Sequence, residues 1–219
     1  MRKIRLLSLL LVLAVTIFSS CEDKDNDNNN SNTNTVSTSI ITELKNYTGK
    51  TSNEFNSAML VKGFTFSEIL TDDMSIYKNA NNTKAYIAIN FNDTVIGAIY
   101  AIITDNKTVL LSDFENNYKK ISTYNAATLS VYEAGVETEN DWLSFDTREE
   151  FLPVYNQYKN DSLIYAEESL INDKYILGTS ISYYSDDEDP TSFSSIIGYI
   201  NFELAWDFKS IKLSKLFKK

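Results

Sequence analysis

The amino-acid sequence predicts an α+β fold in which short helices pack on an antiparallel β-sheet. Apolar residues recur at helical spacing behind Ser/Thr-x-x-Glu capping boxes, and other segments alternate between apolar and polar side chains. Two Asn-Asp pairs separate neighbouring strand-like segments, as short hairpin turns do. Helices precede hairpins twice along the chain, which suggests two similar α-then-β halves that divide near residue 111.

The first folded segment predicts two short helices. Apolar side chains at helical spacing cover residues 40–47, and Gly49 offers a left-handed stop. Thr51 then forms a capping box with Glu54, and the apolar stripe that follows ends at Gly63.

The next segment predicts strands. Residues 74–77 form a short candidate, and residues 84–91 alternate, with Ala85, Ile87, Ile89 and Phe91 on one face. The Asn92-Asp93 pair predicts a hairpin turn. Residues 95–103 are nearly apolar on both faces, which is typical of a central strand.

The second half repeats the order. Ser112 and Thr147 each stand three residues before a glutamate and predict helix starts, the first of a helix of about ten residues. A strand is expected over residues 127–134. Pro153 falls inside the pattern of the second of these helices. Either that helix starts later, with Pro153 in its first turn, or it is kinked at the proline.

The last segment again predicts strands. Residues 163–171 and 175–184 flank the pair Asn172-Asp173, and residues 196–206 alternate. The helix-then-hairpin order is similar to that of some secreted inhibitor and PepSY-like modules, an analogy at the level of the fold alone.

The N-terminus has the layout of a secretory signal. Three basic residues precede thirteen mostly apolar ones, which are too few for a bilayer that needs about 20. The segment Phe18-Ser19-Ser20-Cys21 resembles the lipobox of bacterial lipoproteins, with Phe18 where leucine is usual. The resemblance implies that residues 1–20 are a signal peptide and that Cys21, the single cysteine, carries the lipid. The alternative is a short membrane anchor or a buried helix.

Acidic residues follow the cysteine directly. Residues 21–38 are almost all Asp, Asn, Ser and Thr, which predicts a flexible tether ahead of one globular domain over residues 39–219. The acidic start resembles the export signal of surface lipoproteins of the Bacteroidota and implies an outer-membrane protein that faces the cell exterior. A solvated linker is the alternative reading. The residues concerned are Glu22, Asp23, Asp25 and Asp27.

Charge limits the partners. The chain has 20 basic and 30 acidic residues and a net charge of −10, which makes nucleic acid an unfavourable partner. The membrane is expected to be reached through the lipid on Cys21. An outer-membrane protein or a glycan is the expected partner.

The composition offers few catalytic groups. The chain has no histidine and six glycines, which argues against Ser-His-Asp chemistry, the usual zinc ligands and a glycine-rich phosphate loop. We therefore expect no cofactor and a non-catalytic binding or interaction module. The alternatives are a carboxylate-based hydrolase of surface glycans, which needs two facing carboxylates, and a secreted inhibitor or PepSY-like module. The carboxylates considered for that role are Glu149, Glu150, Glu167 and Glu168.

Two further sets of residues are candidate sites. An acidic run beside two tyrosines suggests a ligand or cation loop, and a solvated loop tip is the alternative. Trp142 and Trp206 are further aromatic candidates for a binding platform. Asp93-Thr94-Val95 and Asp161-Ser162-Leu163 resemble the O-glycosylation motif of the Bacteroidota, with Thr94 and Ser162 as acceptors. The loop candidates are Tyr183, Tyr184, Asp186, Asp187, Glu188 and Asp189.

Overall fold

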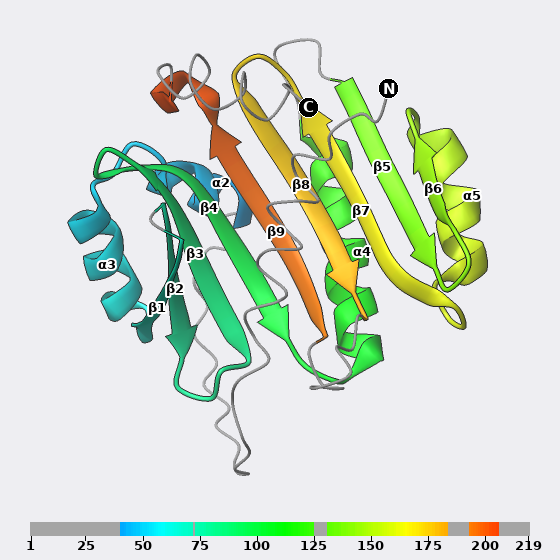
Figure 1. Cartoon of the computed structure of the whole chain (residues 1–219), viewed down its shortest axis with the longest axis horizontal. Coiled ribbons are helices and arrows are strands. Elements are labelled where there is room, and N and C mark those ends of the chain that lie inside the picture. Colours follow the sequence, from blue (N-terminus) through cyan, green and yellow to red (C-terminus); the bar gives the residue numbers. More distant parts are fainter. Residues whose placement is uncertain (1–39, 72, 125–130, 184–192, 206–219) are drawn as a thin grey trace.

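A computed structural model describes residues 40–71, 73–124, 131–183 and 193–205 of the chain. Within these residues, four α-helices pack on one nine-stranded antiparallel sheet, which confirms the predicted α+β fold (Figure 1).

The strand order is β1-β2-β3-β4-β9-β8-β7-β5-β6. Each half of the chain supplies an antiparallel ribbon, and the last strands of the two ribbons, β4 and β9, pair from Gly97 with Ile200 to Ile103 with Ser194. This pairing joins the halves into one continuous sheet. The strands are β1 Phe64–Thr71, β2 Met74–Asn79, β3 Lys84–Phe91, β4 Thr94–Ile103, β5 Val131–Thr138, β6 Trp142–Phe145, β7 Leu163–Ile171, β8 Tyr175–Ser182 and β9 Ser194–Asn201.

All four helices lie on the same side of the sheet (Figure 1). The first two cover the β1–β4 half, and the later two cover the β5–β8 half. A 3-10 turn follows β9. The helical elements are α2 Ile40–Tyr47, α3 Ser52–Val61, α4 Lys107–Thr123, α5 Arg148–Tyr158 and η1 Phe202–Ala205.

The two faces of the sheet carry different side chains. The face under the helices is rich in tyrosine, with Tyr77, Tyr86 and Tyr199 in its core. On the other face, a buried isoleucine cluster spans β2, β3, β4 and β9 and includes no residue of the four helices. The predicted alternation of β3 is confirmed, since Ala85, Ile87 and Ile89 belong to that cluster and Phe91 packs against it.

Several predicted boundaries are confirmed. The Thr51 side chain accepts from the backbone N–H of Glu54, and the Glu54 carboxylate accepts from that of Thr51, which completes the capping box of α3. Asn92 and Asp93 both have positive φ, as the tight turn between β3 and β4 requires.

The start of α4 was predicted wrongly. The helix begins at Lys107 rather than at Ser112, because the Asn106 side chain accepts from the backbone N–H groups of Thr108 and Val109. Residues 109–111 therefore belong to the helix, with Leu110 fully buried and Val109 exposed.

Other boundaries also differ. Helix α5 begins after Thr147 as predicted but continues through Pro153 in its interior. Strand β9 ends at Asn201 and gives way to the 3-10 turn, and Trp206 lies outside the described residues. Strands β1 and β6 had no counterpart in the prediction. Two register irregularities in β1 break the alternation that would reveal it.

Candidate functional site

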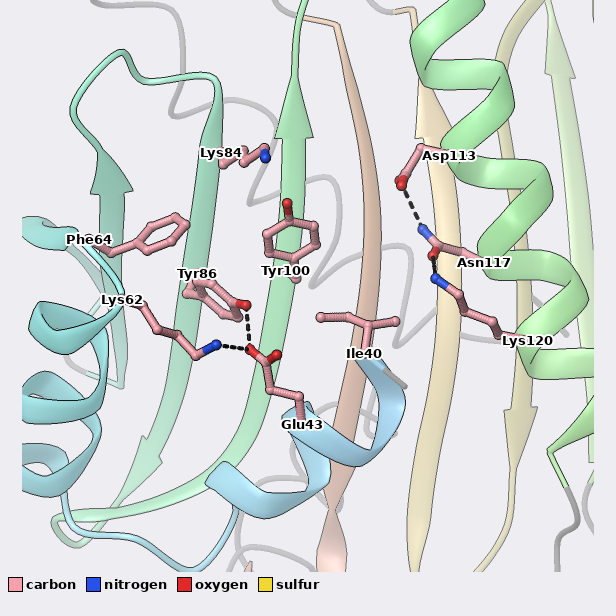
Figure 2. Close-up of a pocket in the computed structure, with 10 residues that line it drawn as sticks. All are labelled: Ile40, Glu43, Lys62, Phe64, Lys84, Tyr86, Tyr100, Asp113, Asn117 and Lys120. Carbon is pink, nitrogen blue, oxygen red and sulfur yellow. Dashed lines mark hydrogen bonds and ion pairs between the residues drawn. The ribbon is translucent and has the colours of Figure 1, made fainter. Parts of the chain in front are cut away.

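A cleft of about 400 Å³ opens on the helix side of the sheet (Figure 2). Helix α2 forms one wall together with Lys62 and Phe64, which follow α3; α4 forms the other wall, and β3 and β4 form the floor between them. It is lined by Ile40, Glu43, Lys62, Phe64, Lys84, Tyr86, Tyr100, Asp113, Asn117 and Lys120.

Glu43 is held in place by three donors. The hydroxyl of Tyr47 donates to its Oε1 at 3.2 Å, the buried hydroxyl of Tyr86 donates to the same oxygen, and Lys62 Nζ lies 3.3 Å from it. Burial and, after it, the Glu43 carboxylate raise the pKa of Tyr86 well above its ordinary value. Both tyrosines therefore remain neutral donors, and Lys62 balances the charge of Glu43.

Asp113 is held in the same way on the opposite wall. Its Oδ2 accepts from Asn117 Nδ2 at 2.9 Å and from Ser195 Oγ at 2.8 Å. Asn117 is almost fully buried, and its Oδ1 accepts from Lys120 at 3.5 Å. Burial raises the pKa of Asp113, against the opposing effects of these hydrogen bonds and of Lys120 and Lys84.

The floor supplies Lys84 and Tyr100. Tyr86 and Tyr100 are direct partners on β3 and β4, with ring centroids 5.0 Å apart, and Lys84 lies two residues before Tyr86 on the same face. Burial, and then the charges of Asp113 and Glu43, raise the pKa of Tyr100 to about 12. Neither Lys84 nor Lys120 forms an ion pair with any residue that the structure describes.

The cleft is therefore positive within an acidic protein. Its lining carries three lysines against two carboxylates, a net charge of +1, whereas the whole chain carries −10. Hydroxyl groups and aromatic rings complete the lining. Such a site can hold a small polar ligand by hydrogen bonds and charge, with fixed donors and acceptors on all sides.

None of the described residues that the sequence singled out lines this cleft. Tyr183 is buried at the end of β8, where its ring packs against Phe193 and lies under the Lys107 ammonium. The candidates Tyr184, Asp186, Asp187, Glu188 and Asp189 lie outside the described residues, as do Cys21, Glu22, Asp23, Asp25 and Asp27.

The glutamates considered for hydrolysis do not share a site. Glu149 and Glu150 are exposed in the first turn of α5, where the helix dipole favours acidic side chains. Glu167 and Glu168 are successive residues of β7 and so point to opposite faces of the sheet. Glu168 is fully buried and paired with Arg148.

The remaining candidates lie in separate places. Trp142 is half-buried on the edge strand β6, over the backbone of Gly135. Thr94 is the first residue of β4 and Ser162 precedes β7, and both are partly exposed.

Sequence reasoning missed every residue of the cleft, although one signal was present. Leu110, Phe114, Asn117 and Ile121 form the buried stripe of α4, so a polar residue occupies a core position. A buried amide on an apolar stripe requires hydrogen-bond partners, and here these are Asp113 and Lys120.

Comparison with known proteins identifies no family for this chain. No protein-family model matches the chain, and searches of curated proteins and of solved structures find no match. Among the described residues, no three His, Cys, Asp or Glu side chains gather as a metal site would require. No helix in the described part of the chain is long and apolar enough to cross a membrane.

Proposed function

We propose that this chain is a non-catalytic binding module, anchored at the outer membrane by a lipid on Cys21 and facing the cell exterior. The observation that carries the binding role is the cleft between α2, α3 and α4, where two carboxylates and three lysines surround a hollow of about 400 Å³. This volume falls within the range of about 300–1,000 Å³ that is usual for small-molecule sites.

The lining is organised for binding before any ligand arrives. Tyr47, Tyr86 and Lys62 fix Glu43, and Ser195 and Asn117 fix Asp113. Side chains that are already ordered lose little entropy when a ligand binds. The surface role rests on the sequence alone, namely Cys21 and the acidic residues after it.

Binding is tested with the purified full chain and a panel of small neutral sugars, organic acids, amines and amino acids, by ligand-observed NMR. Ile40→Trp fills the cleft, and Val61→Trp adds the same ring at a site that is 89% exposed outside it. At least one class should bind to the parent and to Val61→Trp but not to Ile40→Trp. If no class binds, or if Ile40→Trp binds normally, the cleft is not a ligand site.

The proposed location of the protein at the cell surface needs a separate experiment. Labelled palmitate should enter the parent chain and not Cys21→Ala, and protease added to intact cells should digest the parent. Replacement of Glu22, Asp23, Asp25 and Asp27 by alanine should protect the protein from protease until the cells are lysed. Equal digestion of both proteins in intact cells would show that the acidic residues are not an export signal.

A second candidate is a carboxylate-based hydrolase, and one observation favours it. Glu43 and Asp113 line the same cleft, and the raised pKa of Asp113 suits a general acid. Prolonged incubation with glycosides of any sugar that binds separates the two functions. Product that forms with the parent and not with Asp113→Asn would establish the hydrolase, and intact glycoside would support a binding module.

A further inference from the structure

The cleft has donors that no described residue uses. Lys84 begins β3, and Tyr100 lies on the neighbouring strand with its side chain on the same face. Figure 2 shows the Lys84 ammonium and the Tyr100 hydroxyl at one end of the cleft. Neither forms a side-chain hydrogen bond or an ion pair with a described residue, although both feel the charge of Asp113. An ammonium beside a neutral phenol is a pair of donors suited to a carboxylate.

The cleft also has acceptors that the described residues leave open. Every described donor to Glu43 uses Oε1, and both described donors to Asp113 use Oδ2. The second oxygen of each carboxylate accepts no hydrogen bond from a described residue. Carboxylate oxygens accept from hydroxyl groups, so the ligand should carry hydroxyls as well as an anionic group.

The net charge and the volume of the cleft narrow the class of ligand further. The lining has a net charge of +1, which one negative charge on the ligand would neutralise. The rings of Tyr86 and Tyr100 form an aromatic floor against which the apolar face of a ring can pack. A volume of about 400 Å³ is at the small end of ligand sites, which favours one or two rings over a long polymer segment.

We infer that the cleft binds an acidic sugar of the hexuronate class. Its carboxylate lies against Lys84 and Tyr100, and its hydroxyls donate to the open oxygens of Glu43 and Asp113. Lys120 adds positive charge from the opposite wall. This inference rests on the proposed binding function and names the ligand class of the same site.

The test uses three monosaccharides that differ in charge. Glucuronate is the anion, and glucuronamide replaces its carboxylate with a neutral amide of the same shape. Glucosamine is the cation, with an ammonium group at C2 and a hydroxymethyl group in place of the carboxylate. NMR titration of the purified full chain at low salt should give about tenfold tighter binding for glucuronate than for glucuronamide, and weaker binding still for glucosamine.

Two single variants of the protein test where the carboxylate of the ligand binds. Lys84→Gln and Tyr100→Phe should each remove most of the preference for glucuronate over glucuronamide. Lys119→Gln is the matched control, because Lys119 is an exposed lysine of α4 outside the lining, and it should leave the preference unchanged.

The contrary results are distinguishable. Equal binding of glucuronamide, or tighter binding of glucosamine, would overturn the acidic-sugar class and leave the proposed binding function intact if Ile40→Trp abolishes that binding. Failure of all three ligands to bind would also overturn the class. Failure of the wider panel as well would overturn the binding function itself.

Discussion

Glu168 is the most deeply buried of the described carboxylates. Its side chain is fully buried, and Arg148 reaches its Oε1 with Nε at 2.6 Å and also with Nη2. The same guanidinium lies over the rings of Tyr118 at 4.9 Å and Tyr132 at 5.6 Å. One ion pair therefore connects the start of α5 to β7 and contacts α4 and β5.

Removal of one residue of the Arg148–Glu168 ion pair should lower the stability of the protein strongly. Glu168→Ala leaves the guanidinium without its counter-ion, and we expect the free energy of unfolding in urea to fall by about 3–5 kcal/mol. Glu149→Ala removes the same charge from an exposed position on α5 and should cost about 1 kcal/mol or less. The double variant Arg148→Met with Glu168→Leu should recover most of the loss. A small effect of Glu168→Ala would mean that the 23% exposed Arg148 side chain is solvated well enough without its partner.

Asp113 should make ligand binding depend on pH. Burial raises its pKa, so it is protonated at a higher pH than an exposed aspartate, and its protonation changes the lining charge from +1 to +2. An anion should therefore bind more tightly as the pH falls toward that pKa, while the carboxyl of glucuronate itself stays ionised above about pH 4.

The measurement is glucuronate titration between pH 7.5 and 4.5. We expect severalfold tighter binding at the acidic end for the parent and a flat profile for Asp113→Asn. The chain has no histidine, and ordinary carboxylates are ionised above about pH 5.5, so few other groups titrate in the upper part of this range. A slope that persists in Asp113→Asn would assign the effect to another group. The other titratable side chains around Asp113 in the cleft are Glu43, Lys62, Lys84, Tyr86, Tyr100 and Lys120.

At the scale of the element, the position of α4 depends on its first turn. Asn106 satisfies two backbone donors there, at 3.1 Å and 3.3 Å. Asn106→Ala should lower the free energy of unfolding by about 1 kcal/mol, and Asn106→Asp should preserve it. Asn116→Ala, at an exposed position within the same helix, should have no effect or a slightly stabilising one. Equal losses at the two sites would show that the cap is not what stabilises the helix.

The β5–β6 hairpin depends on a close contact between a tryptophan and a glycine. A Cβ at Gly135 would overlap Cζ2 and Cη2 of Trp142, so any side chain there must displace the indole. In a Trp206→Phe background, where Trp142 is the single tryptophan, Gly135→Ala should shift the fluorescence emission to longer wavelength. Unchanged emission would mean that the ring does not lie over the glycine.

The elements were predictable where local rules decide them. The α3 capping box and the alternation of β3 each follow from a few neighbouring residues. The start of α4 was placed too late because Ser112 and Glu115 match a capping box, whereas the residue that caps the helix is Asn106. Strand β1 was missed because its bulges interrupt the alternation.

The cleft could not be predicted because it depends on the assembly of distant elements. Glu43, Tyr100 and Asp113 share no local pattern, and the β4–β9 pairing brings α4 alongside α2 over the same strands. Only the amide of Asn117 on an apolar stripe indicated that α4 faces something polar. The absence of histidine and the small number of glycines argue against several classes of catalytic site, but they do not locate a binding site.

At the scale of the whole molecule, one sheet runs through both halves of the chain. The β4–β9 ladder extends from Gly97 with Ile200 to Ile103 with Ser194, and a Cβ at Gly198 would approach Ile99 Cγ1 to 3.1 Å. The isoleucine cluster continues across this junction from Ile87 on β3 to Ile200 on β9. Neither half can lose its structure without exposing the edge strand and core of the other, so we expect a single cooperative unfolding transition.

A substitution in one half, observed from the other, tests this cooperativity. Ile87 is fully buried in the first half, and Ile87→Ala should cost about 2–5 kcal/mol. In the Trp206→Phe background, Trp142 fluorescence reports the second half alone, and far-UV circular dichroism reports the whole chain. Both urea midpoints should fall by the same amount, whereas Val61→Ala, at a side chain that is 89% exposed, should move neither. If the Trp142 transition stayed in place while the circular dichroism transition moved, the halves would unfold as separate domains and the cleft would lie between two independent units.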